Sequence, residues 1–264
     1  MRKACDGLVL RVSDCGEHDR SLVLLTADEG KLYITAKGAR SVKSKTASLC
    51  RICAFVNIEL YEKNRRYWLA GGSVNNAFFG INEDLSSFAL ASYIMQLADE
   101  ITGENCPAHE VLRMTLNTLY AIEQHLKPLE QIKATYELFA ANVSGFTPDL
   151  SSCSLCDGND YSGGLWLDVM NGALICEKCQ NKRGGGLPIP ETDEFETKNI
   201  LLPLDSSALE AMRYVSSAPL QRIFAYGISS EHSMALLSRA AENYLLHHLE
   251  RDFDTLHFYK TVVK

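Results

Sequence analysis

The chain carries Cys153-Ser-Leu-Cys156 and, after nineteen further residues, Cys176-Glu-Lys-Cys179. Two C-x₂-C pairs at this separation are typical of a tetrahedral Cys₄ zinc site, because each pair supplies two thiolates from one tight turn. Four thiolates fill the coordination shell of the ion, whereas a catalytic zinc usually keeps one position for water or substrate. The spacing therefore predicts one structural Zn²⁺ in a segment at about residues 150–183.

Length and composition set the broad class. The 264 residues suffice for two domains, and no apolar run approaches the roughly 20 residues that a membrane span needs. Arg11 interrupts the apolar run near the N-terminus, so we expect no secretory signal. Nine cysteines without an export signal indicate metal binding in a reducing compartment. We expect a cytoplasmic protein that does not bind membranes.

The net charge of −7 is unevenly distributed. Residues 1–80 carry thirteen Lys and Arg against eight Asp and Glu, a balance of +5, and the remainder carries thirteen against twenty-five, a balance of −12. Residues 31–66 contain nine basic residues and only two acidic ones, Glu59 and Glu62. A basic N-terminal module on an acidic chain indicates that this module contacts a polyanion.

The basic module reads as β-structure. Five short runs have strand-like apolar patterns, and Asp28-Glu29-Gly30 forms a hairpin turn between the second and third. The runs are 7–12, 21–26, 31–36, 55–61 and 66–70. Five strands with one long excursion fit a small closed barrel such as the OB-fold, and a β-sandwich fragment is the competing interpretation. We assign residues 1–80 to a nucleic-acid-binding OB-fold domain.

From residue 84 the apolar period changes to that of helices. Helices are expected from Asp84 to Gly103, from Pro107, from Pro128 to Gly145, near Ser206, and from Ser230 to Asp252. Residues 184–190 read as a linker or an ordered loop. The predicted fold class is α+β, with a helical domain over 81–264 that carries the zinc segment.

Catalytic signatures are missing from the sequence. It has no phosphate loop, dinucleotide fingerprint, zinc-protease motif or nucleophile elbow. His18 has the chemistry of a general base, but an exposed polar turn explains it better. Cys50-Arg-Ile-Cys53 leaves open a redox pair, a second metal half-site or two ordinary thiols. We expect no enzymatic activity.

The excursion between the third and fourth strands is a basic arm, residues 37–45. Cations that track phosphates, beside aromatic rings that stack on bases, are what single-stranded nucleic-acid binding needs, and Tyr67 and Trp68 supply rings. The predicted DNA contacts are Arg11, Arg20, Lys31, Lys37, Arg40, Lys43, Lys45, Arg51, Arg65 and Arg66.

Several runs, in the same order along the chain, resemble the RecO family of bacterial DNA-repair proteins. The barrel runs are Asp6-Gly-Leu-Val-Leu-Arg11, Thr26-Ala-Asp-Glu-Gly-Lys31 and Ala36-Lys-Gly-Ala-Arg40. The runs around the zinc segment are Gly145-Phe-Thr-Pro-Asp-Leu-Ser-Ser-Cys153-Ser-Leu-Cys156 and Asn171-Gly-Ala-Leu-Ile-Cys176-Glu-Lys-Cys179.

The resemblance implies a mediator of recombination and DNA repair. Such a protein binds single- and double-stranded DNA, anneals complementary strands and helps RecR to load RecA onto strands coated by single-stranded-DNA-binding protein (SSB). It also implies contact between the helical domain and the SSB C-terminal tail, for which Arg113, Lys127 and Lys133 are candidates. Two alternatives stay open: an RNA-binding barrel with a zinc knuckle that acts in translation, and a zinc-dependent hydrolase.

Overall fold

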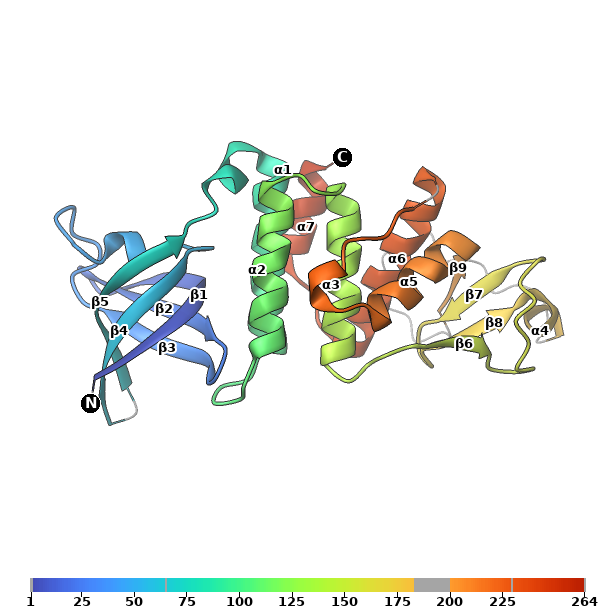
Figure 1. The fold of residues 1–264 in the computed structure, drawn as a ribbon, viewed down its shortest axis with the longest axis horizontal. Helices are drawn as coiled ribbons and strands as arrows, with labels where there is room; N and C mark the ends of the chain where they lie inside the picture. Colours follow the sequence, from blue (N-terminus) through green and yellow to red (C-terminus); the bar gives the residue numbers. More distant parts are fainter. Residues whose placement is uncertain (1, 65, 183–199, 229, 264) are drawn as a thin grey trace. The chain divides into compact units, whose positions relative to one another are not determined.

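The computed structural model describes residues 2–64, 66–182, 200–228 and 230–263 (Figure 1). The chain forms two compact units, Met1–Leu129 with Phe253–Lys264, and Glu130–Asp252. The expected domain boundary after residue 80 stays a prediction, and the helices α1 and α2 that follow the barrel pack with it in the first unit. The overall class is α+β, as predicted.

The first unit contains a closed five-stranded barrel, which confirms the predicted architecture. The strands lie in the order β1-β2-β3-β5-β4, and a parallel pairing between β3 and β5 closes the barrel. Alternate residues of β3 and β4 are buried, as the period of a strand requires. The strands are β1 (Arg2–Cys15), β2 (Asp19–Thr26), β3 (Gly30–Ala36), β4 (Phe55–Lys63) and β5 (Arg66–Asn76).

Three α-helices belong to the same unit as the barrel: α1 (Leu85–Ile101), α2 (His109–Glu123) and α7 (Asp254–Val262). Asp84 caps α1, because its carboxylate accepts the backbone N–H of Ser87 at 2.7 Å. Helix α7 was not expected from the sequence. It packs on α1 (Figure 1). At this contact the rings of Tyr93 and Phe253 meet edge to face, with centroids 5.7 Å apart.

The turn between β2 and β3 is fixed to the loop between α1 and α2. The backbone N–H of Lys31 donates to the carbonyl of Gly103 at 3.1 Å, and the N–H of Ala108 donates to the carbonyl of Ala27 at 2.7 Å. Gly30 has φ +64°, and a Cβ at this position would lie 2.3 Å from the Gly103 oxygen. The turn therefore needs glycine both for its backbone conformation and for the close approach of the loop.

The second unit combines helices with a four-stranded sheet. Its helices are α3 (Leu129–Val143), α4 (Glu177–Lys182), α5 (Ser206–Ser217) and α6 (Glu231–Leu249). The sheet has the order β6-β8-β7-β9 and consists of β6 (Asp149–Cys153), β7 (Leu165–Asp168), β8 (Ala173–Cys176) and β9 (Leu201–Leu204). Short 3₁₀ helices occur at Ala47–Leu49, Phe79–Glu83 and Leu220–Arg222.

The sequence did not predict this second sheet, because its strands have only four or five residues. Residues 184–190, expected to form a linker or a loop, lie outside the described residues. None of the helices in the described part of the chain has the length and apolar character needed to cross a bilayer.

Candidate metal centre and nucleic-acid interface

The four paired cysteines converge in the second unit, as their spacing predicts. The Sγ atoms of Cys153, Cys156, Cys176 and Cys179 all lie within 4.8 Å of one another. Cys153 ends β6, Cys176 ends β8, and Cys179 lies in α4, so the sheet brings the two pairs together. In the described ranges, this is the one group of metal-ligating side chains close enough to share an ion.

The geometry of the cluster fits a tetrahedral ion. Zinc–sulfur bonds of about 2.3 Å in a tetrahedron place neighbouring sulfurs about 3.8 Å apart. The Sγ atoms of Cys156 and Cys176 are 3.8 Å apart. Three of the cysteines are buried and Cys156 is exposed, so the centre reaches the surface on one side. Four thiols that can hold a metal ion in a closed site are therefore present.

Backbone amides prepare one of these thiols for metal binding. Burial alone opposes ionisation of Cys153, but the N–H groups of Cys176, Leu155 and Cys156 are directed at its sulfur and lower its pKa to about 6. The N–H of Cys176 donates to the Cys153 sulfur at 3.4 Å. Because a thiolate is the form that binds metal, these amides favour the state that coordinates an ion.

Two helices hold the sheet that carries the four cysteines in place. Arg213 of α5 donates from Nε to the carbonyl of Leu150 at 2.8 Å, next to the first cysteine pair. His248 of α6 donates from Nε2 to the carbonyl of Val169 at 3.0 Å, and its ring stacks on Phe146 with centroids 5.0 Å apart. Burial lowers the pKa of His248 despite the hydrogen bond to Val169. The cluster is thus connected to the helices on both sides of it.

The barrel carries a cavity of about 780 Å³, which we call the hairpin groove. It lies at the tip of the β4–β5 hairpin and at the end of β3. The rings of Tyr61 and Trp68 are 6.3 Å apart between centroids and tilted by 44°. The residues that line it are Lys37, Tyr61, Lys63, Asn64, Arg66 and Trp68. Three cations and two aromatic rings thus share one cavity.

Strand register explains this grouping and identifies residues that the sequence did not. Tyr61 of β4 pairs with Trp68 of β5 on one side and with Arg2 of β1 on the other. Directly opposed residues project from the same face of a sheet, so the three form one row across the outside of the barrel. Arg2, Tyr61 and Lys63 were not among the predicted contacts. Tyr67 packs against the barrel core instead of facing the groove.

Other predicted cations are engaged with acidic groups of the barrel unit. Lys31 has a side-chain exposure of 15 %, and its Nζ lies 3.0 Å from a carboxylate oxygen of Asp99 and donates to the Asp99 carbonyl at 2.6 Å. Arg11 lies 3.8 Å from the same carboxylate. Lys31 therefore joins β3 to α1, and its expected DNA contact stays a prediction.

Arg20 and Arg40 both contact Asp14, whereas Arg51 stacks over the ring of Phe79 at 4.3 Å from the centroid. On the basic arm, Lys43 and Lys45 are exposed. Arg65 lies outside the described residues. The structure thus brings Lys37 and Arg66 together in the hairpin groove, and the other predicted cations among the described residues do not line it.

The three partner-binding candidates lie in different environments. Lys133 is buried with 3 % side-chain exposure, and its Nζ contacts Glu137 at 2.9 Å and Glu242 at 2.7 Å. Its charge is thus engaged inside the second unit, and its expected contact with a partner stays a prediction. Arg113 is exposed and Lys127 is half-buried, and both lie in the barrel unit.

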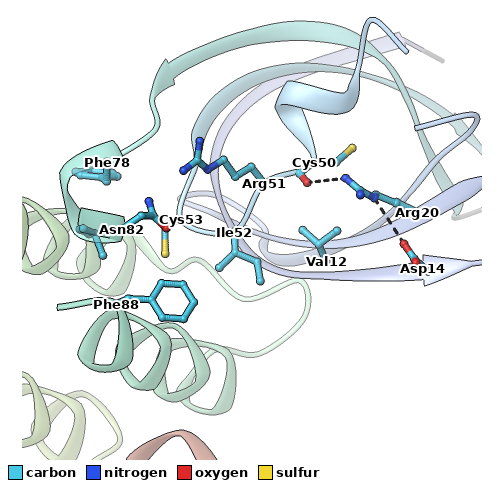
Figure 2. A pocket seen from close by; sticks show the side chains of 11 residues that line it. Val12, Asp14, Arg20, Cys50, Arg51, Ile52, Cys53, Phe78, Asn82 and Phe88 are labelled. Atoms are coloured by element: carbon cyan, nitrogen blue, oxygen red, sulfur yellow. Dashed lines mark hydrogen bonds and ion pairs between the residues drawn. The ribbon is translucent and has the colours of Figure 1, made fainter. Parts of the chain in front are cut away.

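The remaining sequence candidates have plain environments. His18 is exposed and lies 3.9 Å from Glu17 in a polar turn. The sulfurs of Cys50 and Cys53 point away from each other (Figure 2). Burial raises the pKa of Cys50 and raises that of Cys53 to about 12, so neither thiol is activated. This arrangement favours two ordinary thiols.

Comparison with known families and proteins gives a consistent result. The family model described as "Recombination protein O N terminal" matches residues 1–78, and "Recombination protein O C terminal" matches residues 82–193. A DNA repair protein RecO of Acetivibrio thermocellus is 25 % identical over 97 % of this chain and 95 % of its own length. A DNA repair protein RecO of Symbiobacterium thermophilum is 27 % identical over 97 % of this chain and 96 % of its own length. A DNA repair protein RecO of Bacillus subtilis is 28 % identical over 73 % of this chain and 74 % of its own length.

Proposed function

The chain belongs to the RecO family of DNA repair proteins, and on this basis we propose that it binds DNA strands and anneals complementary ones. The proposal includes loading of RecA, together with RecR, onto single strands coated by SSB. The protein acts in the cytoplasm, at the nucleoid. It works through binding and exchange of partners, without a catalytic step of its own.

The hairpin groove is the observation that carries the proposal. None of its six described lining residues is acidic, and it combines three cations with two rings. Cations bind the phosphates of any strand, whereas rings stack only on bases that are not enclosed in a duplex, at about 1–3 kcal/mol per base. The groove therefore favours single strands and has little means of reading base sequence.

Zn²⁺ is the proposed occupant of the Cys₄ cluster. When bound, the ion supplies folding energy to a segment whose own core is small, since the residues packed around the cysteines are few. Cys153, Cys156, Cys176 and Cys179 would hold it, and Arg213 and His248 transmit the order of the segment to α5 and α6.

Arg113 and Lys127 remain the proposed contacts for the acidic SSB tail. Both are cationic, and both belong to the part of the chain that packs with the barrel. If Arg113 and Lys127 bind the SSB tail, the contact would bring SSB-coated DNA to the unit that contains the barrel. Exchange of Arg113 and Lys127 for Gln should weaken recruitment to coated strands while binding to bare strands persists.

Tryptophan fluorescence tests the groove directly, because the chain has only two tryptophans. Trp68 lines the groove, whereas Trp166 lies in β7 of the other unit. In Trp166→Phe the remaining Trp68 emission should be quenched on addition of oligothymidylate. In Trp68→Phe the emission should not respond. Quenching of Trp166 alone would contradict the assignment of the groove.

Annealing tests the wider function. The protein should accelerate pairing of complementary strands coated by SSB, and Tyr61→Ala with Trp68→Ala should reduce that rate. An equal-length RNA strand provides the comparison: tighter binding to RNA, without annealing of DNA, would support the alternative role in translation. Hydrolysis that depends on zinc and tolerates the loss of one cysteine would support the hydrolase alternative.

A further inference from the structure

The carboxylate of Asp14 contacts two arginines, Arg20 and Arg40. Its Oδ1 is 3.6 Å from Nε of Arg20, and its Oδ2 is 3.4 Å from Nη2 of Arg40. One carboxylate, 56 % exposed at its side chain, thus divides its two oxygens between two guanidinium groups. This is the geometry in which a phosphate group would bind the same pair.

Both guanidinium groups are held in place without Asp14. Arg40 donates from Nη1 to the carbonyl of Gly16 at 2.8 Å, and Arg20 donates from Nη1 to the carbonyl of Cys50 at 3.3 Å. These backbone acceptors belong to turns of the barrel unit and are independent of the carboxylate. Removing Asp14 would therefore leave the two arginines oriented.

One donor at this place is unused. Nε of Arg20 is buried and makes no hydrogen bond within the described part of the chain. A buried donor that makes no hydrogen bond costs free energy, so a ligand that supplies an acceptor gains from it. Asp14 does not fill this role, because 3.6 Å is longer than a charge-assisted hydrogen bond of about 2.7–2.9 Å.

A cavity of about 580 Å³ opens beside the pair, with Asp14 and Arg20 on its wall (Figure 2). Arg51 adds a second cation to the wall. Two apolar residues, Ile52 and Phe88, also line the cavity and are 45 % and 41 % exposed. The cavity therefore offers an apolar wall for a base next to guanidinium groups for its phosphate.

We propose that Arg20 and Arg40 form a second phosphate site for a nucleic-acid strand, and that Asp14 occupies this site until a strand displaces it. The proposal rests on the proposed function and adds that Asp14 competes with the strand for the two arginines. The strand's phosphodiester takes the position of the carboxylate, with an oxygen on the unused Nε of Arg20. Asp14 thereby lowers the affinity for DNA and eases its release, which annealing requires.

The test compares Asp14→Asn with Glu17→Gln in the full chain. Both changes remove one negative charge, and Glu17 is an exposed residue of the adjoining turn, 90 % exposed, whose ion-pair partner is His18. Asp14→Asn should raise the affinity for labelled oligothymidylate about three- to tenfold at low salt, since each exposed ion pair is worth up to roughly a factor of five. Glu17→Gln should change the affinity less than about twofold, because salt screens the interaction between an exposed charge and a distant strand.

A double-mutant cycle locates the effect. Arg40→Gln should weaken binding more in the Asp14→Asn background than in the unsubstituted protein, because the arginine is then available to the strand from the start. Equal losses in both backgrounds, or a fall in affinity in Asp14→Asn, would overturn the proposal. So would an equal gain in Glu17→Gln. Thermal unfolding of each variant shows that the fold is retained.

A competition experiment distinguishes the phosphate of a DNA strand from free inorganic phosphate as the anion that binds the two arginines. Inorganic phosphate at matched ionic strength should not cancel the gain of Asp14→Asn, because a strand is held by several contacts at once. If it does cancel the gain, the pair binds a free anion and the strand assignment is wrong. If neither the unsubstituted protein nor Asp14→Asn binds DNA, the proposed function itself fails.

Discussion

Gly30 shows how one residue joins the barrel to the helices of its unit. We expect Gly30→Ala to destabilise the barrel unit by about 2–4 kcal/mol, because the positive φ and the contact with the Gly103 carbonyl both oppose a side chain. Gly16→Ala is the matched control: its φ is +67°, and nothing lies within 4 Å of the added Cβ. That change should cost only about 1 kcal/mol. Denaturant unfolding measures both, and equal losses would show that the close approach is unimportant.

Lys133 is a residue whose role follows from burial. Burial opposes its charge, but the carboxylates of Glu137 and Glu242 raise its pKa. A raised pKa means that the ion pair stabilises the fold fully below the ordinary lysine pKa of about 10.4, and that this contribution is lost as the pH rises through the folded value. The stability should therefore not change with pH near neutrality, where the Lys133 ion pair contributes fully, and should fall in strong alkali, where Lys133 loses its proton.

Lys133→Met should destabilise the second unit by about 3–5 kcal/mol, since two carboxylates stay buried without their cation. Lys178→Met is the surface control, because Lys178 pairs with Asp160 at 3.0 Å while 75 % exposed. Its loss should cost at most about 1 kcal/mol. A loss as small as this for Lys133 would mean that water reaches the triad.

At the scale of elements, α1 depends on its cap. Hydrogen bonds from Ser87 lower the pKa of Asp84. A lowered pKa means that the cap stabilises the helix above the ordinary pKa of about 3.9 and is lost as the pH falls through the folded value. Asp84→Ala should cost about 0.5–2 kcal/mol at pH 7 and much less at pH 2. Asp84→Asn, which keeps an acceptor, should lose less, and a pH-independent loss in Asp84→Ala would contradict the role of the charged cap.

The β6–β9 sheet carries the four cysteines, so its stability should depend on the proposed Zn²⁺. We expect one zinc per chain in protein purified under reducing conditions, and release of the ion by a strong chelator or by mild acid, which protonates the thiolates. Cys176→Ser should lose the metal and the cooperative unfolding of the second unit. Cys106→Ser, at an exposed cysteine of the barrel unit, should keep both. Protein that folds fully without any bound metal would contradict a structural role.

For the whole molecule, the salt dependence of DNA binding counts the phosphates that it contacts. Each phosphate neutralised on a single strand contributes about −0.7 to the log–log slope. Substituting Lys37, Lys63 and Arg66 by Ala should therefore flatten the slope by about 2. Substituting the exposed lysines Lys178, Lys182 and Lys260 should leave it unchanged. An unchanged slope in the groove variant would remove the hairpin groove from the DNA interface.

Local pattern in the sequence was enough to predict the larger elements. Alternation along β3 and β4, the start of α1 near residue 84 and the glycine of the β2–β3 turn each depend on neighbours a few residues away. The zinc segment was predictable for the same reason, since each C-x₂-C pair is one turn. Strands as short as β9 and a C-terminal helix as short as α7 have too few residues to show a period.

The sequence by itself determined the residue types and their order: a closed basic barrel, helices, and four cysteines that can bind one ion. Only the tertiary structure decided which cations form ion pairs and which line the hairpin groove. Lys31 and Lys133 pair with carboxylates, whereas strand register places Tyr61, Trp68 and Arg66 on one outer face. The physical reason is that an ion pair joins residues distant in sequence, such as Lys133 and Glu242, and charge counted along a chain cannot reveal its partner.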